Sequence, residues 1–338
     1  MKKETLDSIS KKIGVSKTTV SRILNGKSEQ YRISKQTCKF VLEKVAEYNY
    51  KPNHVAQNLR NMKSNVIALI VPDIINPFFA NIAGVIIDKA RSCGYIIELF
   101  DTLENLSEER RTLENTQLQN IDGIILVPSG SNPSYVLDVF NANVPIVLID
   151  RYFENCDIPY ISTNNYLGSY NATEYLINAG HRNILCIQGQ SDSITTRERA
   201  RGYIDAMNKY GNSEYCNIVG KDYTLQNGYI ETKISLSSEN HPTAIYTMSS
   251  TILLGALKAI QENNLSIPED ISILSFDNQQ FMDFLNPPIT RVKQPIEDIG
   301  SMSFKLLLDE INNKEKSTKQ ILLNPELIIR KSVKIITK

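Results

Sequence analysis

A short helix predicted over 17–24 carries hydrogen-bonding side chains on one face. These side chains belong to Lys17, Thr18, Ser21, Arg22 and Asn25. An arginine on such a face can hold the O6 and N7 atoms of guanine with two hydrogen bonds, and lysine or threonine can reach base edges or phosphates. The face therefore suits recognition of double-stranded DNA. The competing interpretation is a helical hairpin with a solvated polar surface.

Two short helices around a tight turn would position this face. A first helix is predicted over 6–13, where leucine and isoleucine recur at helical spacing. Gly14 follows where a left-handed C-cap is needed, and Ser16 is a good N-cap for the next helix. Helices joined in this way form a helix-turn-helix, whose second helix enters the major groove of DNA.

Two further helices are predicted before residue 64. Ser34 is a good N-cap for a helix that ends near residue 48, ahead of Pro52. The segment 53–60 has no large apolar face, and an isolated helix below about 12 residues is marginal in water. This segment is therefore a candidate switch that folds only against DNA and a partner helix.

Charge divides the chain at the same place. Residues 1–63 hold 14 Lys and Arg against 5 Asp and Glu, a net charge of +9, which within a neutral chain leaves −9 on residues 64–338. A basic head is attracted to the phosphate backbone, whereas an acidic body is repelled by it. The predicted domains are a DNA-binding head over 1–50, a hinge helix and linker over 51–63, and an effector-binding and dimerisation body over 64–338.

The body alternates apolar strands with amphipathic helices. The run 66–71 is continuously apolar, which is typical of a parallel strand buried on both faces. Further strands are predicted over 95–100, 123–127, 145–149, 184–187, 244–248 and 271–276, and helices over 79–93, 108–120, 135–141, 167–179, 198–210 and 252–261. The fold class is therefore α/β, preceded by an all-α helix-turn-helix domain. Because a body of this length has too many residues for a single hydrophobic core, two lobes are expected, with a ligand between them beyond the strand ends.

Polar and aromatic residues gather at these strand ends. The candidates for ligand binding are Asn76, Phe78, Phe79, Asp150, Arg197, Arg199, Tyr223, Ser249 and Asp277. From residue types alone, the paired phenylalanines are better explained as core. The arginines at a helix start are likewise better explained as partners of surface acids.

Taken together, these motifs resemble the LacI/GalR family of transcription regulators. The resemblance runs nearly end to end and is carried by the run 5–26, by Tyr50-Lys51-Pro52-Asn53 with Ala56 and Leu59, and by the strand-end motifs. It implies that Lys17, Thr18 and Arg22 read bases. Backbone positioning is implied for Ser16, Thr19, Ser21, Asn25 and Asn53. Leu59, helped by Ala56, matches a leucine wedge that enters the minor groove, and His54 is a further candidate contact.

The resemblance also implies the architecture of the body and its ligand. It implies two lobes like those of periplasmic binding proteins, the first about 64–161 and 291–322 and the second about 162–290 and 323–338. The matching ligand positions are Phe79 with Asn76, Arg199 with Arg197 as a second candidate, Tyr223 and Asp277. A carboxylate, arginines and aromatic walls suit a neutral polyhydroxyl ligand, which points to a sugar or sugar derivative; a purine stacked on Phe79 stays open.

Three features depart from the family pattern. The segment 27–32 is longer than the usual link to the third helix. Ser249-Ser250 stands where the family often has Asn-Asp, and Ser275 stands where it often has glycine.

The sequence thus predicts a DNA-binding transcriptional regulator, not an enzyme, that needs no cofactor or metal. It binds a palindromic operator as a homodimer, because one helix-turn-helix reads few base pairs, and a small molecule controls it. No signal peptide or membrane-spanning run is visible, so a cytoplasmic protein is expected. The main alternative is a body that docks a partner protein without any small-molecule effector. An enzyme fused to a DNA-binding head lacks a catalytic constellation, and a transport-type binding protein lacks an export signal.

Overall fold

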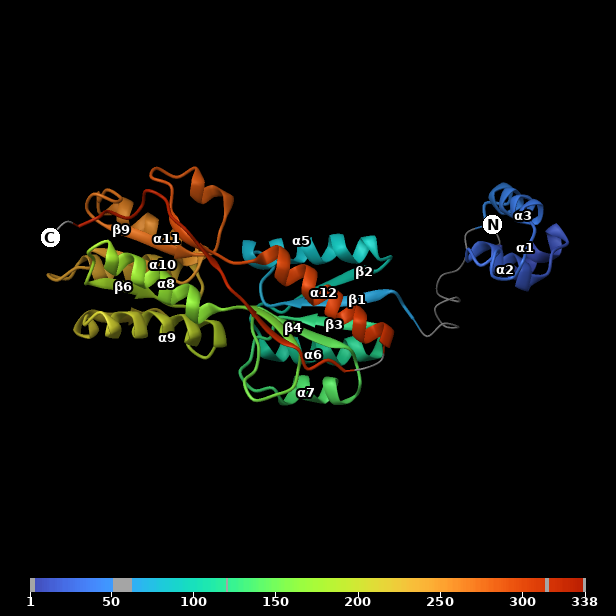
Figure 1. The fold of residues 1–338 in the computed structure, drawn as a ribbon, viewed down its shortest axis with the longest axis horizontal. Coiled ribbons are helices and arrows are strands. Elements are labelled where there is room, and N and C mark those ends of the chain that lie inside the picture. The colour runs from blue at the N-terminus through green and yellow to red at the C-terminus, as the bar shows by residue number, and fades with distance from the viewer. Residues whose placement is uncertain (1–3, 51–62, 120, 314–315, 337–338) are drawn as a thin grey trace. The chain divides into compact units, whose positions relative to one another are not determined.

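The computed structural model describes residues 4–50, 63–119, 121–313 and 316–336. The chain divides into two compact units, residues 1–64 and residues 65–338, which are described separately (Figure 1). The described residues of the first unit are all-α and the second unit is an α/β body with two sheets, so the predicted fold class is confirmed. Within the described residues, no helix is both long enough and apolar enough to span a bilayer.

Three short helices form the described part of the N-terminal unit, residues 4–50. They are α1 (Leu6–Ile13), α2 (Lys17–Leu24) and α3 (Lys35–Glu47). The first two have the predicted bounds because their caps act as expected. Gly14 adopts a left-handed φ of 68° after α1, and the Ser16 hydroxyl accepts a hydrogen bond from the Thr19 amide in α2. Ile9 and Val20 are completely buried in the core between the helices.

The first sheet of the body has the strand order β11-β5-β4-β3-β1-β2, and all its strands are parallel. Its strands are β1 (Val66–Val71), β2 (Ile96–Asp101), β3 (Gly123–Leu126), β4 (Ile146–Ile149), β5 (Tyr160–Thr163) and β11 (Gln320–Leu323). Its helices are α5 (Pro77–Ser92), α6 (Leu106–Leu118), α7 (Ser134–Asn141) and α12 (Ile296–Asn313).

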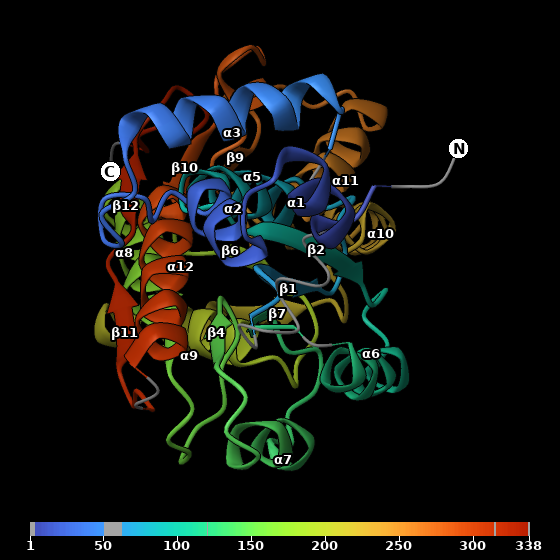
Figure 2. The same ribbon diagram turned by 90° about the vertical axis from the view of Figure 1, so that its right-hand side faces the viewer.

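Helices cover both faces of this first sheet. Alternate side chains of β1, such as Leu69 and Ile70, pack on opposite faces, the first with α5 and α12 and the second with α6 and α7. Figure 2 shows α12 and α6 on opposite sides of the strands. Burial on both faces explains why the sequence of β1 is continuously apolar.

The second sheet has the strand order β12-β10-β9-β8-β6-β7, with only β12 antiparallel to its neighbour. Its strands are β6 (Ile184–Ile187), β7 (Cys216–Val219), β8 (Ala244–Thr247), β9 (Ser272–Phe276), β10 (Thr290–Lys293) and β12 (Glu326–Ile328). Helices α8 (Asn165–Asn178) and α9 (Ile194–Lys209) cover one face, and α10 (Leu225–Leu236) and α11 (Ser250–Glu262) cover the other. Two short 3-10 helices are η1 (Ser213–Tyr215) and η2 (Gln280–Asp283).

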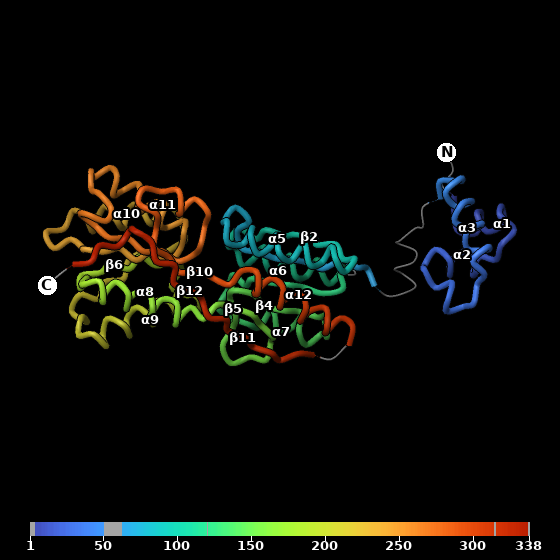
Figure 3. The backbone as a smooth tube through the Cα atoms, turned by 45° about the horizontal axis from the view of Figure 1, so that its top comes forward, coloured from blue at the N-terminus to red at the C-terminus, as the bar shows by residue number. Residues whose placement is uncertain are grey.

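The chain passes between the two sheets after β5, after β10 and between β11 and β12 (Figure 3). We call the parts on either side lobe 1, which holds the first sheet, and lobe 2, which holds the second. The boundaries predicted after residues 161, 290 and 322 each fall inside a strand and are therefore corrected to the ends of those strands. A strand cannot leave its sheet midway without losing its ladder of hydrogen bonds.

Several elements were not predicted from the sequence. They are β5, β7, β10, β11, β12, α10 and α12. Helix α9 also begins at Ile194, whereas the prediction began at residue 198. Its first turn, Ile194-Thr195-Thr196, is β-branched and has low helix propensity, but all three residues are buried, and tertiary packing outweighs that propensity.

Two glycines bring the backbones of α10 and α11 into contact. A Cβ atom added at Gly228 would lie 2.1 Å from the Ile252 carbonyl oxygen, and one added at Gly255 would lie 2.0 Å from the Leu225 carbonyl oxygen. These contacts leave no room for a methyl group unless the helices separate.

Gly255→Ala should therefore lower the free energy of unfolding by about 3 kcal/mol, because overpacking forces α10 and α11 apart. Urea unfolding followed by circular dichroism measures this change. Gln261→Ala, at an exposed position of the same helix, is the matched control and should change the free energy by less than about 0.5 kcal/mol. Equal stability of the two variants would show that the helices separate freely.

Candidate DNA interface and ligand cleft

Helix α2 presents the predicted DNA-contacting side chains with different degrees of exposure. Ser16, Lys17, Thr18 and Asn25 are exposed, whereas Thr19, Ser21 and Arg22 are half-buried. Within the part of the chain that the structure describes, the side chains of Lys17 and Thr18 form no hydrogen bond or ion pair. They are therefore available to a nucleic acid.

Four of the predicted contacts also support the helix itself. The Ser16 hydroxyl oxygen lies 2.8 Å from that of Thr19, and the Asn25 side-chain amide donates a 2.8 Å hydrogen bond to the Ser21 carbonyl oxygen. These interactions fix both ends of α2 and thus the direction of its outer face. The predicted hinge contacts Asn53, His54, Ala56 and Leu59 lie outside the described residues.

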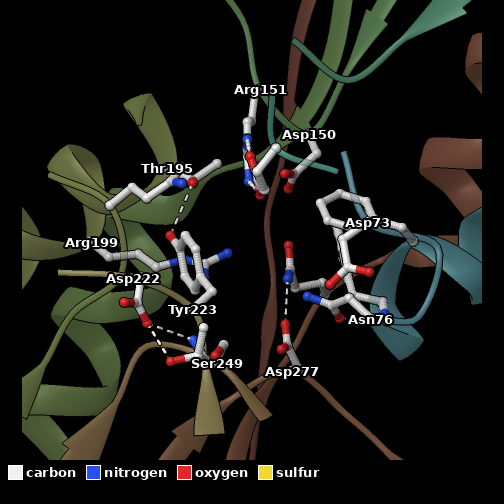
Figure 4. Close-up of a pocket in the computed structure, with 16 residues that line it drawn as sticks. Asp73, Asn76, Asp150, Arg151, Thr195, Arg199, Asp222, Tyr223, Ser249 and Asp277 are labelled. Atoms are coloured by element: carbon white, nitrogen blue, oxygen red, sulfur yellow. Dashed lines mark hydrogen bonds and ion pairs between the residues drawn. The ribbon is translucent and has the colours of Figure 1, made fainter. Parts of the chain in front are cut away.

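A cavity of about 210 Å³ opens between lobes 1 and 2, beyond the C-terminal ends of β1, β4, β8 and β9 (Figure 4). Of the predicted ligand residues, those that line it are Asn76, Phe78, Phe79, Asp150, Arg199, Tyr223, Ser249 and Asp277. Further lining residues, which were not predicted, are Asp73, Glu104, Arg151, Gln190, Thr195, Asp222, Thr224 and Gln294. Side chains from both lobes therefore face one another across this cleft.

Arg197 does not line the cleft, in contrast to its prediction as a second ligand-binding arginine. Its guanidinium donates a 2.7 Å hydrogen bond to the Glu154 carboxylate, and both side chains are about half exposed. This is the surface ion pair that the residue type alone suggested. Arg199, two positions further along α9, is buried and lines the cleft.

Three donors hold the carboxylate of Asp277 at the end of β9. One of its oxygens accepts hydrogen bonds from the amide and hydroxyl of Ser250, at 2.9 and 3.1 Å, and the other accepts one of 2.7 Å from the Gln294 side chain. The serine at position 250, a departure from the family pattern, is therefore used to orient the aspartate. Ser249 caps α11 beside it, because its hydroxyl accepts a hydrogen bond from the Ile252 amide.

Asp150, at the end of β4, is buried with an unsatisfied carboxylate. Its Oδ1 atom has no hydrogen-bond partner among the described residues. Burial raises the pKa of this carboxyl to about 6, against the opposing effect of Arg151 and Arg199. The next residue, Arg151, donates hydrogen bonds of 2.6 and 2.7 Å to both oxygens of Glu104, so its charge is already compensated. Asp150 thus lines the cleft as a buried carboxyl whose Oδ1 atom has no donor among the described residues.

Phe78 and Phe79, at the start of α5, serve the core and the cleft together. Each is 4% exposed and belongs to the apolar core of lobe 1, and each also lines the cavity. Their rings meet edge to face, 5.2 Å apart. Asn76 caps the helix by accepting a hydrogen bond from the Phe78 amide. The two interpretations of this aromatic pair, core and ligand wall, are therefore compatible.

Arg199 and Tyr223 form the opposite wall, in lobe 2. Arg199 stacks on the Phe276 ring, 3.7 Å from its centroid, and donates hydrogen bonds to the Asn165 side chain and the Met248 carbonyl oxygen. The Tyr223 hydroxyl lies 2.6 Å from that of Thr196. A Cβ atom at Gly189 would lie 2.3 Å from the Tyr223 ring, so the glycine makes room for the tyrosine.

The comparisons with known proteins identify the family. The sequence pattern of the bacterial regulatory proteins of the lacI family matches residues 5–53, and that of a periplasmic binding protein-like domain matches residues 173–333. The HTH-type transcriptional repressor PurR of Pasteurella multocida is 32% identical over 334 residues, 98% of each chain. The chain belongs to the LacI family. The ribose operon repressor of Halalkalibacterium halodurans is 33% identical over 333 residues, 98% of this chain and 97% of that one.

Solved structures of LacI-family proteins share the fold. The lac repressor dimer bound to operator and the anti-inducer ONPF matches with a TM-score of 0.88 at 26% identity, over 98% of this chain and 100% of that chain. A LacI family transcriptional regulator from Enterococcus faecium with bound ribose matches with a TM-score of 0.72 at 25% identity, over 80% and 100% of the two chains. This LacI-family protein is therefore a DNA-binding transcription regulator and not an enzyme.

The buried carboxyl of Asp150 should make stability depend on pH. The pKa of this carboxyl is about 6 in the folded protein, whereas its ordinary value is 3.8. Because the folded state holds the proton more tightly, the group makes its full contribution to stability below pH 3.8 and loses it as the pH rises through 6. Asp150→Asn cannot titrate, and asparagine tolerates the φ of 61° at this position. Between pH 4.5 and 7.5, the free energy of unfolding of the wild type should fall by about 2 kcal/mol relative to this variant. Urea unfolding at both pH values measures the difference, and a constant difference would contradict the burial argument.

Proposed function

We propose that this LacI-family protein is a repressor that binds a palindromic operator as a homodimer and is controlled by a neutral sugar between its lobes. The observation that carries the ligand assignment is the polar and aromatic cleft of about 210 Å³. A cleft of this size between the lobes suits a small ligand such as a monosaccharide. The names of the ribose operon repressor and of the ribose-bound regulator support the same class of ligand.

The charge of the cleft favours a neutral sugar over a phosphorylated one. Its carboxylates belong to Asp73, Glu104, Asp150, Asp222 and Asp277, against the two guanidiniums of Arg151 and Arg199. Both guanidiniums already donate hydrogen bonds to protein oxygens. Sugar hydroxyls can donate to these carboxylates, whose oxygens can each accept more than one hydrogen bond, whereas a phosphate would be repelled by them.

On the DNA side, the proposal assigns base contacts in the major groove to Lys17, Thr18 and Arg22 of α2. The exposure of the first two and the capped ends of the helix support this assignment. The wedge of Leu59 and the contacts of Asn53, His54 and Ala56 stay predictions from the sequence. Binding to operators in the chromosome would place the protein in the cytoplasm.

A homodimer is proposed because half-sites of a palindrome demand two copies related by two-fold symmetry. Lobe 2 offers an apolar surface for this purpose. Ile230 and Ile234 of α10 are 41% and 63% exposed, and Leu254 of α11 is 40% exposed. Exposed aliphatic side chains on two helices that pack together support a contact between copies of the chain on this surface.

Control by the sugar follows from the position of the cleft. A ligand that contacts both lobes favours the arrangement of lobes in which all of its contacts form. If that arrangement differs from the one that binds DNA best, the sugar lowers DNA affinity, and by linkage DNA lowers sugar affinity by the same factor. If the two arrangements coincide, the sugar acts as a co-repressor.

Selection of genomic fragments with the purified full-length protein, followed by footprinting, tests the function. We expect enrichment of a palindrome about two helical turns long or shorter. Adding ribose should change the footprint, whereas ribose 5-phosphate should not. A purine base is the third ligand tested. A response to the purine alone would replace the sugar by a nucleobase, and no response to any small molecule would favour a body that docks a partner protein. Failure to enrich any site under all these conditions would contradict the function itself.

Asp277→Ala should abolish the response to the sugar, and the variant should still bind the operator when no ligand is present, because the carboxylate lies in the cleft and not in the DNA-binding head. Thermal shift with ribose and gel shift on the selected operator measure the two effects. Glu239→Ala, which removes an exposed carboxylate from the same lobe, is the control and should respond to ribose like the wild type. An Asp277→Ala protein that responds normally would show that the ligand binds elsewhere.

A further inference from the structure

The longer link between α2 and α3 is an ordered turn in this structure. Its backbone is closed by hydrogen bonds from the Lys27 amide to the Arg22 carbonyl oxygen, at 2.9 Å, and from the Ile33 amide to the Ser28 carbonyl oxygen, at 2.9 Å. The φ of Arg32 is 51°, a left-handed conformation that is uncommon for residues other than glycine. The turn therefore has a defined shape, and that shape fixes the direction in which Tyr31 projects.

Tyr31 projects back onto the outer face of α2. The guanidinium carbon of Arg22 lies 3.7 Å from the centroid of the Tyr31 ring. Tyr31 is 44% exposed and is not part of the apolar core between the three helices, so its ring packs on the arginine and not into the domain. Among the described residues, no hydrogen bond or ion pair occupies the Arg22 side chain.

We propose that Tyr31 is a specificity-determining residue that positions Arg22 for reading a base. The inference rests on the proposed DNA-binding function and assigns a role to the longer link. Tyr31 holds the guanidinium over its ring before DNA arrives, so the arginine meets the duplex in one orientation instead of many.

The geometry of a guanidinium makes this role possible. Its N–H donors point outward in the plane of the group, and guanine O6 and N7 accept two of them in that plane. An aromatic ring covers the face of the group and leaves the donor edge free. Stacking on Tyr31 therefore restricts the arginine without competing with the base for its hydrogen bonds.

The ring, and not its hydroxyl, carries this role. Stacking needs only a π-face, which phenylalanine also provides, whereas a hydrogen bond from tyrosine to a DNA phosphate needs the hydroxyl. A phosphate contact would also weaken binding to all sequences alike, because phosphates carry no direct sequence information. The two roles therefore predict different results for Tyr31→Phe and for the pattern of base preference.

The test uses the full-length protein and a library of DNA duplexes with a random core, sequenced before and after selection. Tyr31→Ala should reduce preference for the favoured base at one position of each half-site by roughly two- to five-fold, the effect of an exposed cation–π contact. Arg22→Ala should lose preference at that same position, and Tyr31→Phe should keep it. In the Arg22→Ala background, Tyr31→Ala should have no further effect, because the two residues act as one unit.

Phe40→Ala is the matched control, because Phe40 of α3 is an aromatic residue of similar exposure, 41%, and should leave the base preference intact. Circular dichroism checks that each variant is folded. Unchanged preference in Tyr31→Ala would overturn the inference, as would uniform weakening at all positions or an effect that persists without Arg22. If the wild-type protein enriches no site, the proposed function is contradicted, and this inference with it. If the wild-type protein enriches a site and Tyr31→Ala has the same base preference, only this inference is contradicted.

Discussion

The hydrogen bonds of the Asp277 carboxylate connect the ligand cleft to the segments that join the lobes. Gln294, which donates to this carboxylate, stands where the chain leaves β10, and it accepts a 2.7 Å hydrogen bond from Thr163, the last residue of β5. All three side chains are buried, and an unpaired polar group at such a site would cost about 1 to 3 kcal/mol. Hydrogen bonds thus connect the crossings after β5 and β10 to the Asp277 side chain. A ligand that bonds to Asp277 therefore acts directly on the joint between the lobes.

Signals that lie within a few residues of one another were sufficient to predict much of this fold. Helices α1 and α2 have the predicted bounds because Gly14 and Ser16 act through local backbone geometry alone. The strand β1 was recognised because it is buried on both faces and is apolar throughout. Eight of the nine predicted ligand residues line the cleft, because most of them follow strands and the C-terminal ends of parallel strands meet at one edge. The family resemblance then singled out individual positions among them.

What the sequence did not reveal depends on contacts between distant segments. Arg197 and Arg199 are two positions apart, which on a helix is a rotation of about 200°, so only one can face the cleft. Which one does so depends on how α9 packs. Gln294 and Glu104 also line the cleft, and each has a partner, Asp277 or Arg151, that no local pattern indicates. Helix α12 was missed although buried residues recur along it, since its role is to cover the first sheet from a distant part of the sequence.

The two sites of the protein use the same arrangement of arginine and aromatic ring for different ends. Arg199 stacks on Phe276 and Arg22 stacks on Tyr31, each 3.7 Å from the ring centroid. In the cleft, the edge of the guanidinium is occupied by Asn165 and the Met248 carbonyl oxygen, so this arginine supports the wall of a preformed pocket. On α2, the ring fixes only the face of the group, and the donors stay available for a partner outside the protein. A stacked arginine therefore acts as part of the scaffold when protein oxygens take up its donors, and as a recognition element when they do not.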